Sequence, residues 1–147
     1  IDNGQFTDTK QLELNGLLKQ YLQDYEEVYD YRNIEVTIDE QDIFNVTINE
    51  SLAVALLTNL LKNAFVHNID GGHIRITVTK NSITFRNSGV KNPLDKEHIF
   101  ERFYQGTKKE GSTGLGLAIA DSICRLQHLS IRYYFEQKEH CFEISRQ

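Results

Sequence analysis

The apolar residues in the first part of the chain follow two different periods. Residues 34–39 (IEVTID) and 44–48 (FNVTI) alternate between apolar and polar positions, which is typical of half-buried strands. Residues 12–15 (LELN) are a candidate short edge strand, and the polar residues 1–11 are expected to be a lead-in. A helix that reaches about Asp30 is predicted after residue 15, because apolar side chains recur there at helical spacing. These side chains are Leu17, Leu18, Tyr21, Leu22 and Tyr25.

The middle of the chain predicts a long helix followed by a hairpin. Asn49 is a candidate helix cap, and the apolar pattern behind it continues to about His67. Residues 73–79 (HIRITVT) and 82–87 (SITFRN) are two predicted strands, and Lys80–Asn81 is the predicted turn between them.

The pattern breaks down over residues 88–113, apart from a short apolar helix predicted around residues 97–104 (EHIFERFY). A further helix is predicted from Leu115 to about Gln127. Residues 130–136 (SIRYYFE) and 141–146 (CFEISR) then form a second predicted hairpin. This mixed order of helices and strands predicts a two-layer α/β sandwich. The predicted loop over residues 88–113 is unusually long for a compact domain, and such loops are often functional lids.

Composition narrows the class of protein. The chain has 147 residues, which is enough for one domain, and its net charge of −5 argues against a nucleic-acid or anionic-membrane binder. No apolar run is long enough to cross a membrane, so direct insertion is not expected. The first residue is Ile1 rather than Met, so we expect an excised piece of a longer protein. Cys124 and Cys141 match no metal or redox spacing and are expected in the core.

Two amides on the long predicted helix are candidate ligands. Asn59 and Asn63 are four residues apart and share a face with Leu52, Leu56 and Val66. A buried amide needs a partner, so one interpretation is that both side chains cap neighbouring backbone. The other is that their hard, neutral oxygens face Mg²⁺, which takes the rest of its shell from water and phosphates.

The segment FRNSGV places Asn87 at the end of a predicted strand and Gly89 two residues later. A side-chain oxygen there can accept a hydrogen bond from an exocyclic amine, and the glycine lets a flat ring lie against the backbone. The same residues also fit an ordinary Asn–Ser–Gly turn.

The segment GSTGLGLAIADSI, residues 111–123, brings Gly114 and Gly116 to the start of a helix. Glycine disfavours a helix interior by roughly 1 kcal/mol relative to alanine, so either special backbone angles or a close approach is expected there. Exposed amides at a helix N-terminus bind anions. The order G-x-x-G-x-G matches neither the dinucleotide fingerprint nor a Walker motif, so this segment alone is a weak signal.

Taken together and in this order, the motifs N-x-x-x-N-A, N-x-G, IFERF and TGLGLAI resemble the ATP-binding catalytic domain of bacterial sensor histidine kinases, in the GHKL group of ATPases. The resemblance runs from about Leu12 to the C-terminus. It implies that residues 1–147 are one catalytic domain with a GHKL (Bergerat) fold. In that fold a mixed sheet packs on about three helices, and residues 88–113 are the ATP lid.

The resemblance also implies roles for the residues around the nucleotide. Asn63 matches the asparagine that binds Mg²⁺, and Asn59 supports the ion and the phosphates. Asn87 stands where the family has the aspartate that accepts a hydrogen bond from the adenine N6, with Gly89 as its usual neighbour. His67 stands where the family often has Tyr or His beside the nucleotide.

Further implied contacts lie in and after the lid. Phe100 and Phe103 match the aromatic residues of the lid, and Arg102, Lys108 or Lys109 can supply a positive charge to the phosphates. Gly114 and Gly116 match the glycines that cradle the phosphates. Their neighbours Thr113, Leu115 and Leu117 are also implied to contact the nucleotide.

Four positions depart from the family pattern. Asn87 replaces the aspartate, Lys91 replaces a second glycine, and Val66 and Gln105 fall where many relatives carry basic residues. These departures keep open the alternative of a degenerate interaction module that no longer binds ATP.

The resemblance implies that the chain binds Mg-ATP and donates the γ-phosphate to a histidine. The position of the water-activating glutamate in other GHKL ATPases is Asn59 here, which cannot act as a base. None of the five histidines lies in an H-E-x-x-x-P context. The acceptor is therefore expected on a dimerisation domain before Ile1, with a response regulator downstream.

By itself the chain is expected to be monomeric and to show little turnover. The resemblance implies a cytoplasmic domain of a membrane-anchored bacterial sensor. A serine kinase of the anti-sigma-factor type is the other alternative, although such kinases usually lack the FERF box.

Overall fold

The computed structural model describes residues 8–104 and 114–147. The N-terminal part contains β1 (Lys10–Glu13), α1 (Leu14–Val28), the 3₁₀ helix η2 (Asp30–Arg32), β2 (Glu35–Glu40) and β3 (Asn45–Ile48). The rest contains α2 (Glu50–Val66), β4 (His73–Val78), β5 (Ser82–Asn87), α3 (Gly116–Leu126), β6 (Leu129–Glu136) and β7 (Glu139–Arg146). Among the described residues, no helix is both long and apolar enough to cross a membrane.

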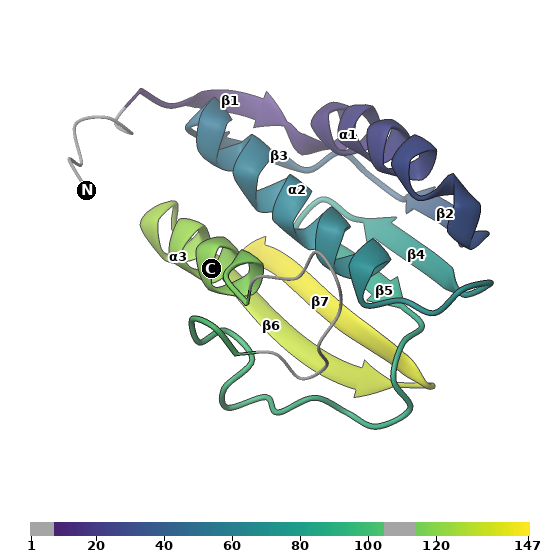
Figure 1. Cartoon of the computed structure of the whole chain (residues 1–147). Coiled ribbons are helices and arrows are strands. Elements are labelled where there is room, and N and C mark those ends of the chain that lie inside the picture. The colour runs from purple at the N-terminus through teal and green to yellow at the C-terminus, as the bar shows by residue number, and fades with distance from the viewer. Residues whose placement is uncertain (1–7, 105–113) are drawn as a thin grey trace.

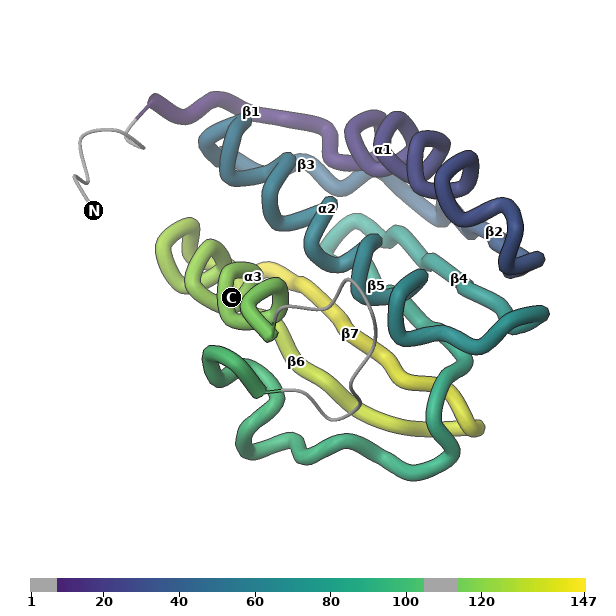
Figure 2. Tube along the Cα trace, viewed as in Figure 1, coloured from purple at the N-terminus to yellow at the C-terminus, as the bar shows by residue number. Residues whose placement is uncertain are grey.

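The three α-helices lie side by side over one face of a mixed sheet (Figure 1, Figure 2). The strand order in this sheet is β2-β4-β5-β7-β6, and β2 pairs with β4 in parallel while the other pairs are antiparallel. β1 and β3 form a separate antiparallel pair. The predicted two-layer α/β sandwich with three helices is therefore confirmed.

Helix α2 is the middle helix of the helical layer, and its sequence reflects that position. Its buried residues are spread around much of its circumference because α2 packs on the sheet between α1 and α3. They are Leu52, Ala53, Leu56, Leu57, Leu60, Leu61, Ala64, Phe65 and Val66. Beneath them, Ile74 and Ile76 of β4 and Phe85 of β5 are at most 1% exposed. The polar Asn59 and Asn63 are thus held on a helix whose placement is fixed by packing on several sides.

Most of the predicted elements are present, and two predictions need correction. The edge strand comprises residues 10–13 rather than 12–15, because Leu14 already lies in α1 with its side chain fully buried. No helix forms over residues 97–104. The backbone there makes successive turns, in which Glu101 N donates to His98 O and Tyr104 N donates to Glu101 O. The apolar pattern reflects the burial of Ile99, which is 2% exposed, rather than a helical face.

Both predicted hairpins are confirmed. β6 and β7 are longer than predicted and meet at Gln137 and Lys138, which both have positive φ, 52° and 63°. A two-residue turn of this type usually contains Asn or Gly, so the sequence does not reveal it. Cys124 and Cys141 are buried and unpaired, as predicted, and burial raises the pKa of Cys124 to about 12 and that of Cys141 to about 11.

Side chains from other elements complete both ends of α2. At the N-terminus, Asn49 Oδ1 accepts a hydrogen bond from Leu52 N at 3.1 Å, which confirms the predicted cap. At the C-terminus, Arg32 donates to the carbonyl oxygens of Phe65 and, at 2.8 Å, Asn68, and its Nε donates to Asp70 at 2.8 Å. The Arg32 side chain is only 13% exposed. It satisfies carbonyl groups that a helix end leaves without intrahelical partners.

We expect Arg32→Ala to lower the free energy of unfolding by about 2–3 kcal/mol, because buried carbonyl groups lose charged donors. Urea denaturation measures this change. Arg125→Ala is the matched control, since Arg125 is 79% exposed and its one ion pair within residues 8–104 and 114–147 is with Asp121 on the same helix. Equal stability losses in the two variants would contradict the proposed capping role of Arg32.

Candidate nucleotide-binding site

Asn59 lies against the N-terminus of α3. A Cβ atom added to Gly116 would lie 3.0 Å from Asn59 Oδ1, so the absence of a side chain at Gly116 allows this approach. Asn59 Nδ2 donates to Ala55 O at 2.7 Å, and this bond turns the amide oxygen toward α3. The interpretation of Asn59 as a residue that bonds neighbouring backbone is therefore correct for its nitrogen, while its oxygen faces Gly116.

Asn63 differs from Asn59 in its contacts. It is half-buried one helical turn further along α2, and its backbone carbonyl accepts a hydrogen bond from His67 N at 3.1 Å. Within the described part of the chain, its side-chain amide makes no hydrogen bond with protein atoms. The amide oxygen is a hard, neutral donor atom of the kind that Mg²⁺ takes from proteins. Asn63 thus fits a metal ligand better than a backbone cap.

Asn87, at the end of β5, has a buried oxygen atom without a partner. The residue is 2% exposed, and its Nδ2 donates to Ser88 O at 2.7 Å. This bond assigns the amide orientation, because only the nitrogen can donate to a carbonyl. Asn87 Oδ1 then has no hydrogen-bond partner among the described residues. Such an atom costs roughly 1–3 kcal/mol, and an amine donor on a ligand would remove that cost.

Gly89 is enclosed by two residues of other elements. A Cβ atom there would lie 3.0 Å from the carbonyl oxygen of His67 and 3.1 Å from Cδ2 of His140. The turn formed by residues 87–89 therefore lies between the C-terminal cap of α2 and the ring of His140. Both contacts leave no room for a side chain. Gly89 was predicted to let a flat ring lie against the backbone, and the protein atoms nearest to it in the structure belong to His67 and His140.

Phe103 and Gly114 are eleven residues apart in the sequence and are in contact in the structure. Phe103 N donates to Gly114 O at 2.6 Å, and a Cβ atom on Gly114 would lie 2.7 Å from Cα of Phe103. Gly114 also has a φ of 75°, a conformation that favours glycine. The predicted need for glycine at this position therefore has two physical causes, the backbone angle and the contact with Phe103.

The two predicted lid phenylalanines are placed differently. The Phe100 ring packs edge-on against Phe142 of β7 at 6.3 Å. Phe103 is 66% exposed, and the guanidinium of Arg102 lies 5.4 Å from its ring centroid. Phe100 therefore packs against the sheet, whereas Phe103 and Arg102 are exposed.

The charge character of the N-terminus of α3 suits an anion. Among the described residues, no side chain caps α3, and its first turn contains no acidic residue. Helix N-termini of this kind attract negative charge. Leu115 precedes the helix, and Leu117 is partly buried against the core.

The departures from the family pattern have distinct environments. Val66 is 6% exposed and belongs to the buried face of α2, whereas Lys91 is exposed. Thr113, Gln105, Lys108 and Lys109 lie outside the described residues.

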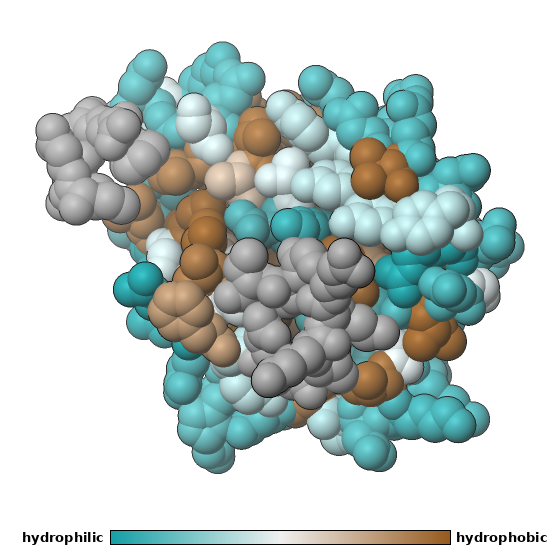
Figure 3. Space-filling model, in the orientation of Figure 1, coloured by the Kyte–Doolittle hydropathy of each residue, from teal (hydrophilic) through white to brown (hydrophobic). Residues whose placement is uncertain are grey.

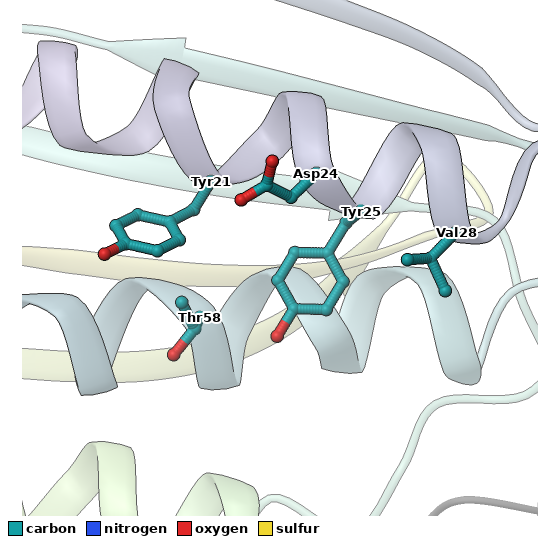
Figure 4. A pocket seen from close by; sticks show the side chains of 5 residues that line it. All are labelled: Tyr21, Asp24, Tyr25, Val28 and Thr58. Carbon is teal, nitrogen blue, oxygen red and sulfur yellow. The ribbon is translucent and has the colours of Figure 1, made fainter.

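A separate hollow lies between α1 and α2 (Figure 4). Its lining residues are Tyr21, Asp24, Tyr25, Val28 and Thr58. This lining contains no basic side chain and none of the predicted nucleotide-site residues. The hollow therefore lacks the positive charge that would suit a triphosphate.

His140 is a site residue that sequence reasoning did not find. It lies opposite Asn87 in the β5–β7 ladder, is 4% exposed, and its ring contacts the position of Gly89. The sequence offers little indication of this role, because a histidine within the segment EHCFEI looks like an ordinary strand residue. Only the pairing of the strands brings it to Asn87.

Comparison with known proteins places these features in a family. Residues 48–145 match the family described as histidine kinase-, DNA gyrase B- and HSP90-like ATPase. The heme sensor protein HssS of Staphylococcus aureus (strain Newman) is 33% identical in an alignment 127 residues long that covers 83% of this chain and 28% of HssS. The sensor histidine kinase RppB of Synechocystis is 43% identical in an alignment 84 residues long that covers 51% of this chain and 18% of RppB.

Solved structures agree with this assignment. The nucleotide-free catalytic domain of histidine kinase ThkA has a TM-score of 0.82 and 25% identity, with 94% of each chain covered. The mycobacterial sensor histidine kinase MprB has the same fold, with a TM-score of 0.80 at 18% identity, covering 93% of this chain and 99% of that one.

The predicted family and fold are confirmed by the family match, the relatives and the shared architecture. The chain spans less than a third of the length of HssS and of RppB. It belongs to the histidine kinase-, DNA gyrase B- and HSP90-like ATPase family, among the ATP-binding catalytic domains of sensor histidine kinases.

Proposed function

We propose that this domain binds Mg-ATP and donates the γ-phosphate to a histidine on a dimerisation domain of the same protein, in two-component signal transduction. The observation that carries the proposal is the buried Oδ1 of Asn87, which has no hydrogen-bond partner among the described residues. An adenine N6 amine is a donor that would satisfy it. Guanine presents a carbonyl oxygen at the corresponding position and would leave the Asn87 oxygen without a donor.

The phosphates and the metal are assigned to the space between α2 and α3. Asn63 would bind Mg²⁺, and Asn59 would support the ion and the phosphates. Gly114 and Gly116 would leave the start of α3 accessible to the triphosphate, with its amide groups facing the negative charge. The donor set fits Mg²⁺, because neutral amide oxygens and phosphate oxygens are its preferred partners. His67 would lie beside the nucleotide, and Arg102 would contribute positive charge.

Transfer to a histidine is favoured over hydrolysis. The amide of Asn59 cannot take a proton from water, so this position does not supply a general base. Phosphoryl transfer depends mainly on positioning and on charge neutralisation, which Mg²⁺ and a helix N-terminus provide. The same absence argues against the serine kinase alternative, whose members usually carry a glutamate near the Mg²⁺ asparagine.

The partners follow from the proposed transfer. The phosphoacceptor domain would contact the face over α3, where apolar residues gather in the space-filling view (Figure 3) and where Ile119 and Leu126 are 42% and 43% exposed. A response regulator would receive the phosphate next. A solved structure shows histidine kinase ThkA in complex with the response regulator TrrA, so that kinase binds a response regulator.

The first prediction concerns Mg²⁺. Binding of a non-hydrolysable ATP analogue should require Mg²⁺, and Asn63→Ala should weaken it at least about tenfold, because the metal loses a protein ligand. Isothermal titration calorimetry with and without Mg²⁺ measures both effects. Asn45→Ala, the same change at an exposed position of β3, is the control and should leave the affinity unchanged.

Failure of the unaltered chain to bind the analogue would overturn the proposal. That outcome would favour the alternative of a degenerate interaction module, which Asn87, Lys91, Val66 and Gln105 leave open.

The second prediction concerns the base. Asn87→Ala should weaken binding of the ATP analogue about tenfold, because the only buried acceptor assigned to the adenine amine is removed. The unaltered chain should prefer the ATP analogue over the GTP analogue, and the variant should lose most of that preference. Competition binding with the two analogues measures it. An unchanged preference in Asn87→Ala would show that another group selects the base.

A further inference from the structure

We propose that His140 is a positioning residue for the base-binding turn, and that it acts through a hydrogen-bond relay with Tyr133. The relay consists of Leu94 N–H, the Tyr133 hydroxyl, the His140 imidazole and the Val90 carbonyl. It ties the turn beside Asn87 to the first residues of the predicted lid. This inference rests on the proposed function, since the positioned group is the acceptor for the base.

The relay has one consistent arrangement of hydrogen atoms. His140 Nε2 lies 2.7 Å from Val90 O, and a carbonyl oxygen can only accept, so Nε2 carries the hydrogen. His140 Nδ1 then accepts from the Tyr133 hydroxyl at 2.7 Å. The same hydroxyl oxygen accepts from Leu94 N at 2.9 Å. Every donor in the relay therefore meets an acceptor, and the neutral histidine is held in one tautomer.

The side chains of the relay are buried, so the loss of any one of its hydrogen bonds is costly. Tyr133 and His140 are both 4% exposed, and their rings stack at 5.9 Å. Phe135 packs against the other side, with its ring centroid 4.7 Å from that of His140. Burial lowers the pKa of His140 below its ordinary value, in agreement with a neutral ring at pH 7. Breaking one bond would leave a buried polar group without a partner.

The ring of His140 also borders the site directly. His140 is the cross-strand partner of Asn87, and its Cδ2 would lie 3.1 Å from a Cβ atom on Gly89. One ring therefore packs against Gly89 and holds the carbonyl of Val90, the next residue. The position of Asn87 Oδ1 depends on the path of this backbone, because Asn87 Nδ2 is bonded to Ser88 O within the same turn.

The relay holds both ends of the segment from Val90 to Leu94. Within this segment lie Lys91, where relatives of the predicted family have a glycine, and the turn-forming pair Asn92–Pro93. Hydrogen bonds from β6 and β7 therefore add to the local turn in fixing this stretch. The start of the predicted lid is thus anchored to the sheet beside the base-binding turn.

Two variants and a matched control test the relay. Tyr133→Phe removes only the hydroxyl, and His140→Phe keeps the ring stacking but removes both nitrogens. Tyr134→Phe makes the same change as Tyr133→Phe on the neighbouring residue, which faces the opposite side of the sheet and stacks with Arg132. His140→Gln is the rescue variant, because its amide nitrogen can still donate toward Val90 O.

The affinity for a non-hydrolysable ATP analogue is measured by calorimetry, and hydrogen exchange of the Leu94 amide is measured by NMR. Tyr133→Phe and His140→Phe should each weaken binding about tenfold and make the Leu94 amide exchange faster, because the turn loses its anchor. His140→Gln should recover much of the affinity lost in His140→Phe. Tyr134→Phe should change neither quantity.

The outcomes separate this proposal from the proposed function. Faster exchange at Leu94 in Tyr133→Phe with unchanged affinity would overturn the positioning role and leave the nucleotide site intact. No binding by the unaltered chain would overturn the proposed function and this inference together. If His140→Phe does not fold, Tyr133→Phe decides the question, because it retains the aromatic ring and its packing.

Discussion

The geometry of this domain depends on how α2 is held. The helix is buried against the sheet and both neighbouring helices, so it cannot rotate without exposing apolar side chains. Asn49 completes its first turn, and Arg32, a residue 17 positions before the cap, completes its last turn. The polar residues that α2 presents toward α3 and β5 are therefore fixed by contacts that have nothing to do with ligand binding. A rigid helix of this kind can hold two amides in place without a ligand.

The candidate site contains polar groups that lack a hydrogen-bond partner among the described residues. Asn87 buries an oxygen without a partner, and the first turn of α3 has neither a cap nor an acidic residue among the described residues. The buried oxygen of Asn87 would destabilise a domain that bound nothing there. Three glycines among the predicted site residues, Gly89, Gly114 and Gly116, allow approaches that a Cβ atom would block. Protein atoms make these close approaches, so the glycines shape the walls against which a nucleotide would lie.

The elements that the sequence predicted well are those with a strong local signal. The cap at Asn49, the period of α2 and the alternation in β4 and β5 all depend on neighbours within a few residues. The prediction of a helix over 97–104 was wrong, because apolar residues such as Ile99 are buried there from a series of turns. His140 was missed for a related reason. Its contacts with Tyr133 and Val90 come from strand pairing and from a segment 50 residues away.

The sequence by itself determined the family, the order of the elements and the residue types at the site, because these are properties of local pattern and motif spacing. It left two interpretations of Asn59 and Asn63 open, and two of Asn87. Only the tertiary structure decided that Asn59 bonds Ala55, that Asn63 has no such bond among the described residues, and that Asn87 turns its oxygen inward. The physical reason is that the partner of a polar atom is set by what packs against it. The nitrogens of Asn59 and Asn87 bond residues that are near in sequence, Ala55 and Ser88. Only folding, however, places Gly116 beside the oxygen of Asn59 and buries the oxygen of Asn87.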